Sequence, residues 1–107
     1  MDALNELHVW QRSKDLAVSI YKLLFSCKDR GFKDQLTRAC ISIPSNIAEG
    51  YERHSKKEFA RYLKIAKGSC AEVRTQLIIG QEIGLRTPKY VINLLKSHYR
   101  FQKCCRV

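Results

Sequence analysis

The sequence has 107 residues, of which 45% are hydrophobic, and this length and composition fit a single globular domain spanning residues 1–107 rather than a disordered chain. Twenty Lys and Arg side chains outnumber ten Asp and Glu side chains, which gives a formal net charge of +10 at pH 7. A cationic surplus of this size favours polyanionic partners such as nucleic acid, although basic proteins also occur without any nucleic-acid role.

The first predicted helix covers about Val9 to Ser26. Apolar residues recur along it in steps of three and four, through Leu16, Ile20 and Leu23, and this spacing marks one helical face. Residues 29–31 are then expected to form the connection to the next helix.

The second predicted helix covers about Lys33 to Arg53 and contains Pro44. A proline inside a helix removes one backbone donor and clashes with the preceding turn, so the segment is either one kinked helix or two helices with a break. The apolar spacing continues in phase through Ile43 and Ile47, which favours a single helix kinked at Pro44.

The third predicted helix begins at a capping box, in which Ser55 accepts from the first backbone donors and Glu58 reaches back. The helix is expected to end near Ile83, with Gly84 in a left-handed conformation. Three small residues in its middle predict close approach of another helix: Gly68, Ser69 and Ala71.

The fourth predicted helix begins at Thr87, as the N-terminal cap, and Pro88, in the first turn. Strands are not expected, because no stretch alternates cleanly between apolar and polar residues. Four helices with short connections predict an all-α fold, an antiparallel up-down-up-down four-helix bundle.

No catalytic or metal-ligating pattern is present. His8, His54 and His98 are scattered, and the five cysteines form no C-x-x-C pair, so we expect no enzyme, no metal and no cofactor. Without a signal-peptide pattern or an apolar run long enough to span a membrane, the chain is expected to be cytoplasmic, with reduced thiols acting as small core residues. The cysteines are Cys27, Cys40, Cys70, Cys104 and Cys105.

Lysine and arginine side chains recur on one face of the third and of the fourth predicted helix. Cations three, four or seven residues apart fall within about 60° of arc on a helix and form a stripe. Such a stripe suits consecutive phosphates, although a solvated outer helix face has the same pattern. The candidate nucleic-acid-binding residues are Lys57, Arg61, Lys64, Lys96, Arg100 and Lys103.

The segment around Pro44 carries a second polar pattern. Ser42, Asn46, Glu49 and Arg53 follow at intervals of four, three and four, so they share one helix face. Glu49 and Arg53 are spaced for an ion pair, and Asn46 is placed to bond to another helix. We interpret the face as a polar network that fixes helix register or assembly, with a binding surface as the alternative.

The same segment resembles a known family. The string S-I-P-S-N-I-A-E-G ending at Gly50, together with Glu58-Phe59, Tyr62-Leu63 and Gly68-Ser69, is similar to the four-helix bundle proteins encoded in intervening sequences of bacterial large-subunit ribosomal RNA genes. The similarity extends over most of residues 7 to 85. Signature positions of the family, without a catalytic role, correspond to Ser42, Pro44, Asn46, Glu49, Gly50 and Arg53.

The resemblance implies assembly into a ring-like homopentamer. It also implies a relationship to the accessory variability protein of diversity-generating retroelements, which binds nucleic acid and a reverse transcriptase. Two functions are therefore expected: a nucleic-acid-binding homo-oligomer, or alternatively a protein-interaction scaffold for a nucleic-acid enzyme such as a reverse transcriptase.

Overall fold

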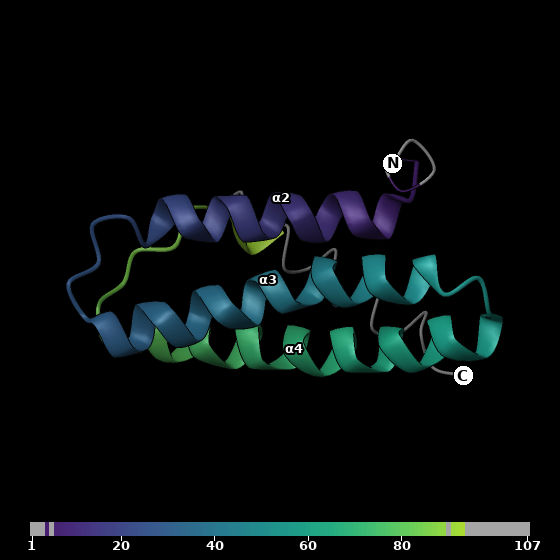
Figure 1. Ribbon diagram of the computed structural model, residues 1–107. Helices are drawn as coiled ribbons and strands as arrows, with labels where there is room; N and C mark the ends of the chain where they lie inside the picture. The colour runs from purple at the N-terminus through teal and green to yellow at the C-terminus, as the bar shows by residue number, and fades with distance from the viewer. Residues whose placement is uncertain (1–3, 5, 90, 94–107) are drawn as a thin grey trace.

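The computed structural model in Figure 1 describes residue 4 and residues 6–89 and 91–93. These residues form helices, turns and short connections without a strand, so the prediction of an all-helical fold is confirmed. The long helices are α2 (His8–Leu23), α3 (Arg30–Glu52) and α4 (Lys56–Glu82).

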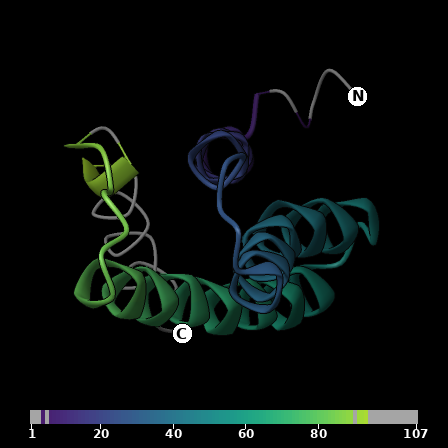
Figure 2. The same cartoon turned by 90° about the vertical axis from the view of Figure 1, so that its left-hand side faces the viewer.

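Helix α3 is the central element of these three. It runs back alongside α2, and α4 in turn runs back alongside α3 (Figure 1). Viewed from the end, α3 and α4 lie side by side while α2 stands apart on one side of the pair (Figure 2). The surface shared by α3 and α4 is therefore the most extensive helix contact in the described part of the chain.

Helix α2 is shorter at its C-terminal end than the sequence predicted. The backbone leaves the helical conformation at Leu24, and the Phe25 amide donates to the Lys22 carbonyl in a tighter turn. The Leu24 side chain is fully buried. The prediction extended the helix to Ser26 because the apolar spacing continues that far. In the structure this spacing results from the burial of Leu24 in the turn after the helix.

Helix α3 begins three residues before the predicted start, because the Asp29 carboxylate caps it. Its Oδ1 atom accepts from the Phe32 amide at 3.1 Å, so residues 30 and 31 belong to the first helical turn and not to the connection. The helix continues through Pro44 to Glu52, which excludes the alternative of two separate helices. The kink at Pro44 stays a prediction.

Both predicted ends of α4 are confirmed. Ser55 Oγ accepts from the Glu58 amide at 3.3 Å at the N-terminus. At the C-terminus Gly84 has a φ of +105°, and the Leu85 and Gly84 amides donate to the carbonyls of Gly80 and Gln81. This pair of bonds is the Schellman arrangement, which satisfies the last carbonyls of a helix.

The fourth predicted helix is described only at its beginning. Lys89 and residues 91–93 are helical, and the Pro88 carbonyl accepts from the amides of Val91 and Ile92. The first helical bond thus starts at Pro88, one residue later than predicted. Thr87 Oγ1 is buried without a hydrogen-bond partner among the described residues, so the expected cap at Thr87 is not formed there.

The core lies between the three long helices and the segment that follows α4. Residues from all of these elements are fully buried in it, among them Ile20, Ile43, Val73 and Val91. Cys40 and Cys70 belong to the same cluster, which confirms their predicted role as small core residues. No described helix is both long and apolar enough to traverse a lipid bilayer.

Candidate functional site

Three of the six predicted nucleic-acid-binding residues lie on the outer face of α4. Lys57, Arg61 and Lys64 are all exposed, and they follow one another at intervals of four and three within one helix. Neighbours at this spacing are about 5–6 Å apart between Cβ atoms, so the three form one continuous group, which we call the α4 basic stripe. The other three residues, Lys96, Arg100 and Lys103, lie outside the described residues, as do His98, Cys104 and Cys105.

The α4 basic stripe contains an ion pair that the sequence did not predict. Arg61 Nε donates to Glu58 Oε2 at 2.8 Å. This bond lowers the pKa of the Glu58 carboxyl and raises that of the Arg61 guanidinium. The Glu58 side chain thus points toward Arg61, and the predicted return contact of the capping box is replaced by this pair because a charged donor is the stronger partner.

Tyr62 connects the stripe to the polar face of α3. Its ring is flanked by two guanidinium groups, with the Arg61 carbon 4.7 Å and the Arg53 carbon 5.3 Å from the ring centroid. The hydroxyl accepts from Arg53 Nη2 at 2.8 Å and donates to Glu49 Oε1 at 3.3 Å. The Tyr62 side chain is buried as a whole.

The Glu49–Arg53 ion pair is present as predicted, at 3.3 Å between Arg53 Nη2 and Glu49 Oε1. Asn46, in contrast, has no bond to another helix among the described residues. Its Nδ2 atom donates to the carbonyl and hydroxyl oxygens of Ser42 in its own helix. The bond to α4 is made by Ser42 itself, whose hydroxyl lies 2.8 Å from that of Ser69. The network therefore joins α3 to α4, as the structural interpretation requires.

The close approach of two helices occurs at Gly50, not at Gly68. A Cβ atom at Gly50 would lie 2.6 Å from the Tyr62 Cβ atom. At Gly68, which is exposed, a Cβ atom would have no neighbouring atom within 4 Å. Among the described helices, the expectation of close approach is met at Ser69 but not at Gly68, because Gly68 is exposed on the same side as the basic stripe.

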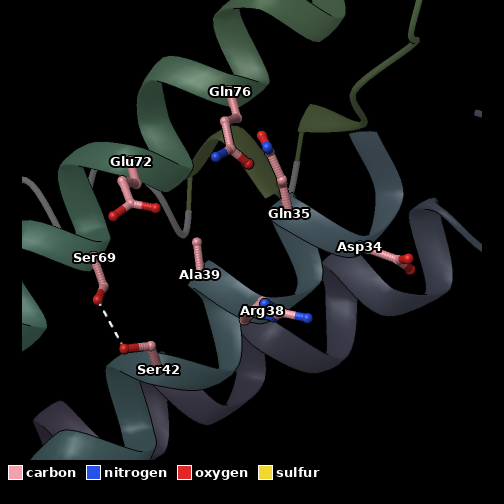
Figure 3. A pocket seen from close by; sticks show the side chains of 8 residues that line it. All are labelled: Asp34, Gln35, Arg38, Ala39, Ser42, Ser69, Glu72 and Gln76. Carbon is pink, nitrogen blue, oxygen red and sulfur yellow. Dashed lines mark hydrogen bonds between the residues drawn. The ribbon is translucent and has the colours of Figure 1, made fainter. Parts of the chain in front are cut away.

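Between α3 and α4 lies a groove of about 500 Å³ (Figure 3), which we call the α3/α4 groove. The Ser42–Ser69 bond lies at one end, and Gln35 and Gln76 point toward each other at the other end. The Oε1 atom of Gln76 is buried and has no hydrogen-bond partner among the described residues. The remaining lining residues are Asp34, Arg38, Ala39 and Glu72.

The buried thiols are poor nucleophiles at neutral pH. Burial raises the pKa of the Cys70 thiol to about 11 and raises that of the Cys40 thiol still further. His8 and His54 are exposed and belong to different elements, His8 at the start of α2 and His54 just after the end of α3. Within the described ranges, no three His, Cys, Asp or Glu side chains are grouped as a metal site would require.

Comparisons with known proteins support the fold. A family model described as "23S rRNA-intervening sequence protein" matches residues 5–105 of this chain. The chain is also similar to the crystal structure of a protein with unknown function from the S23 ribosomal protein family of Bacteroides thetaiotaomicron. The TM-score is 0.76 at 25% sequence identity, over 91% of this chain and 94% of that chain. No curated protein matches the sequence.

Proposed function

We propose a function from the premise that this chain belongs to the 23S rRNA-intervening sequence protein family, whose model covers residues 5–105. The protein is a non-enzymatic, basic, cytoplasmic homo-oligomer of antiparallel four-helix bundles, and it binds RNA or DNA through Lys- and Arg-rich helix faces. A homopentamer is the assembly implied by the resemblance of the sequence to its family.

The observation that carries the proposal is the exposure of the α4 basic stripe. Lys57, Arg61 and Lys64 stand together on one solvent-facing side of a regular helix. Arg61 keeps binding capacity despite its ion pair, because a guanidinium has five N–H donors and the bond to Glu58 uses the Nε donor. Its stacking on Tyr62 also restricts the orientations of the guanidinium, which lowers the entropy lost when a phosphate binds.

A salt titration of RNA and DNA binding tests this proposal. The variant Lys57→Gln, Arg61→Gln, Lys64→Gln is expected to bind at least tenfold more weakly, and the slope of log K against log salt is expected to become shallower by about 2, at roughly 0.7–0.9 per phosphate contact. The measurement is a filter-binding titration at several salt concentrations, alongside the mass of the protein in solution.

A matched control removes the same number of charges elsewhere. Arg12, Lys28 and Arg30 are exposed and lie on α2, in the loop and at the start of α3. Changing all three to Gln gives the same net charge as the stripe variant and should leave most of the slope in place. Equal slopes for wild type and stripe variant would reject the α4 basic stripe as the contact surface. The predicted residues Lys96, Arg100 and Lys103 form a second triple variant for the same assay.

A protein-interaction scaffold is the second candidate. It is favoured by large apolar side chains on the surface, such as Phe25 at 85% and Ile83 at 68% exposure. In this case the positive charge speeds the association with a nucleic-acid enzyme, but it does not stabilise the complex once formed. A partner that stays bound after nuclease treatment and in high salt would support the scaffold, and loss of that partner under both treatments would reject it.

A further inference from the structure

A second, smaller pocket lies at the turn that joins α3 to α4, and we call it the Tyr51 pocket. Its volume is about 250 Å³. This is less than the roughly 300 Å³ from which pockets for drug-sized ligands begin, so it suits a single flat ring system. None of its lining residues is acidic, and they are Gly50, Tyr51, His54, Ser55, Lys56 and Phe59.

Two aromatic rings, those of Tyr51 and Phe59, stand nearly perpendicular to each other in this pocket. Their centroids are 6.1 Å apart and their planes meet at 78°. The Phe59 ring packs against Gly50, where a Cβ atom would lie 3.2 Å from Phe59 Cδ1. Both aromatic side chains are only partly buried. A flat ring that enters can therefore stack on one of them and meet the other edge to face, and both arrangements are favourable between aromatic rings.

The Tyr51 pocket and the α4 basic stripe meet at the first turn of α4. Lys56 lines the pocket, and the next residue, Lys57, begins the stripe; both side chains are exposed. Consecutive helix residues point about 100° apart, so a ligand that occupies both places has to pass around this turn. A chain of nucleotides can do so, because its phosphates contact the lysines while one of its bases turns toward the aromatic rings.

We propose that the Tyr51 pocket binds one unpaired base of a single-stranded nucleic acid whose backbone follows the α4 basic stripe. The inference rests on the proposed function and deepens it, because it names a single strand rather than a duplex as the preferred ligand. Aromatic rings beside a row of cations are the combination with which proteins bind single strands without reading their sequence. The bases of a duplex are paired and stacked, and one of them reaches a pocket only if it is flipped out at a cost in free energy.

Tyr51→Ala tests the pocket, and Tyr51→Phe is the matched control because it keeps the ring. In a filter-binding titration with a short oligothymidine strand, Tyr51→Ala is expected to raise the dissociation constant about tenfold, as for the loss of one stacked base. Tyr51→Phe should bind as the wild type does. Neither variant changes a charge, so the slope of log K against log salt should stay that of the wild type. All three proteins should bind duplex DNA equally, and circular dichroism confirms that each is folded.

A strand without bases provides a test that needs no variant. The wild type is expected to bind an abasic strand of the same length about tenfold more weakly than oligothymidine, whereas Tyr51→Ala should bind both strands alike. Equal affinity of the wild type for the two strands would overturn the proposal and leave the pocket to an apolar side chain of a protein partner. In that case a shallower salt slope of the stripe variant would still support the proposed function. A wild type that binds neither RNA nor DNA would reject both.

Discussion

Gly50 of α3 lies so close to Tyr62 of α4 that a Cβ atom at Gly50 would stand 2.6 Å from the Tyr62 Cβ atom. Both residues are buried, and the contact is between two helix backbones with little freedom to move. We expect Gly50→Ala to lower the free energy of unfolding by about 1–3 kcal/mol through overpacking, although alanine is the better helix former. Urea denaturation measures the change.

Gly68→Ala is the matched control for that substitution. Gly68 also lies inside α4, but it is exposed and its Cβ position is open. The change is expected to raise the free energy of unfolding by about 0.5–1 kcal/mol, because alanine loses less backbone entropy in a helix. If both substitutions stabilise the protein, the two helices do not approach as closely as described.

Tyr62→Phe removes the hydroxyl that bonds to both Arg53 and Glu49. We expect a loss of about 1 kcal/mol in the free energy of unfolding. The loss should shrink when Arg53→Gln is already present, and a double-mutant cycle measures this coupling. Tyr51→Phe, which removes a tyrosine hydroxyl elsewhere on α3, should change stability by less than about 0.5 kcal/mol. Additive effects of Tyr62→Phe and Arg53→Gln would show that the bond contributes nothing.

The Glu58–Arg61 pair predicts a dependence of stability on pH. The hydrogen bond from Arg61 lowers the pKa of the Glu58 carboxyl in the folded protein. The pair therefore contributes its full stability above the unfolded pKa of about 4.3, and the contribution is lost as the pH falls through the lower folded pKa. Glu58→Gln should be less stable than wild type at pH 7, and the difference should shrink by pH 3 in thermal denaturation. A difference that is constant with pH would contradict the pair.

His54 occupies a left-handed backbone conformation, with a φ of 53°, at the end of α3. An L-residue with a side chain is strained there, whereas glycine is not. We expect His54→Gly to raise the free energy of unfolding by about 1 kcal/mol, seen as a higher thermal midpoint. His54→Ala keeps the strain and should bring no such gain. An equal effect of both substitutions would point to the loss of the imidazole as the cause.

The ends of α4 could be predicted because their signals act within one helical turn. Ser55 and Gly84 need only nearby backbone groups to perform their roles. The start of α3, in contrast, was predicted three residues too late. Gly31 is a poor helix former, and the bond from the Phe32 amide to Asp29 shows that residues 30 and 31 belong to the helix.

The sequence predicted the part of the candidate site that depends on one helix alone. The spacing of Lys57, Arg61 and Lys64 is sufficient to place them on one exposed face. The roles of Tyr62 and Ser69 depend on how α4 packs against α3, which no spacing within one helix reports. Among the described residues, the Asn46 amide bonds within its own helix, to the Ser42 carbonyl, which the spacing of the polar residues did not indicate.

Under the proposed function, the Glu58 carboxylate beside Arg61 would make the α4 basic stripe favour anions that contact several cations at once. An anion that binds the remaining N–H donors of Arg61 lies close to the negative charge of Glu58, whose Oε2 atom is 2.8 Å from Arg61 Nε. A single mononucleotide would exchange one partner for another at small net gain, whereas a long strand reaches Lys57 and Lys64 in the same event. Under the proposed function, Glu58 would thus weaken the binding of single small phosphates more than that of a polymer.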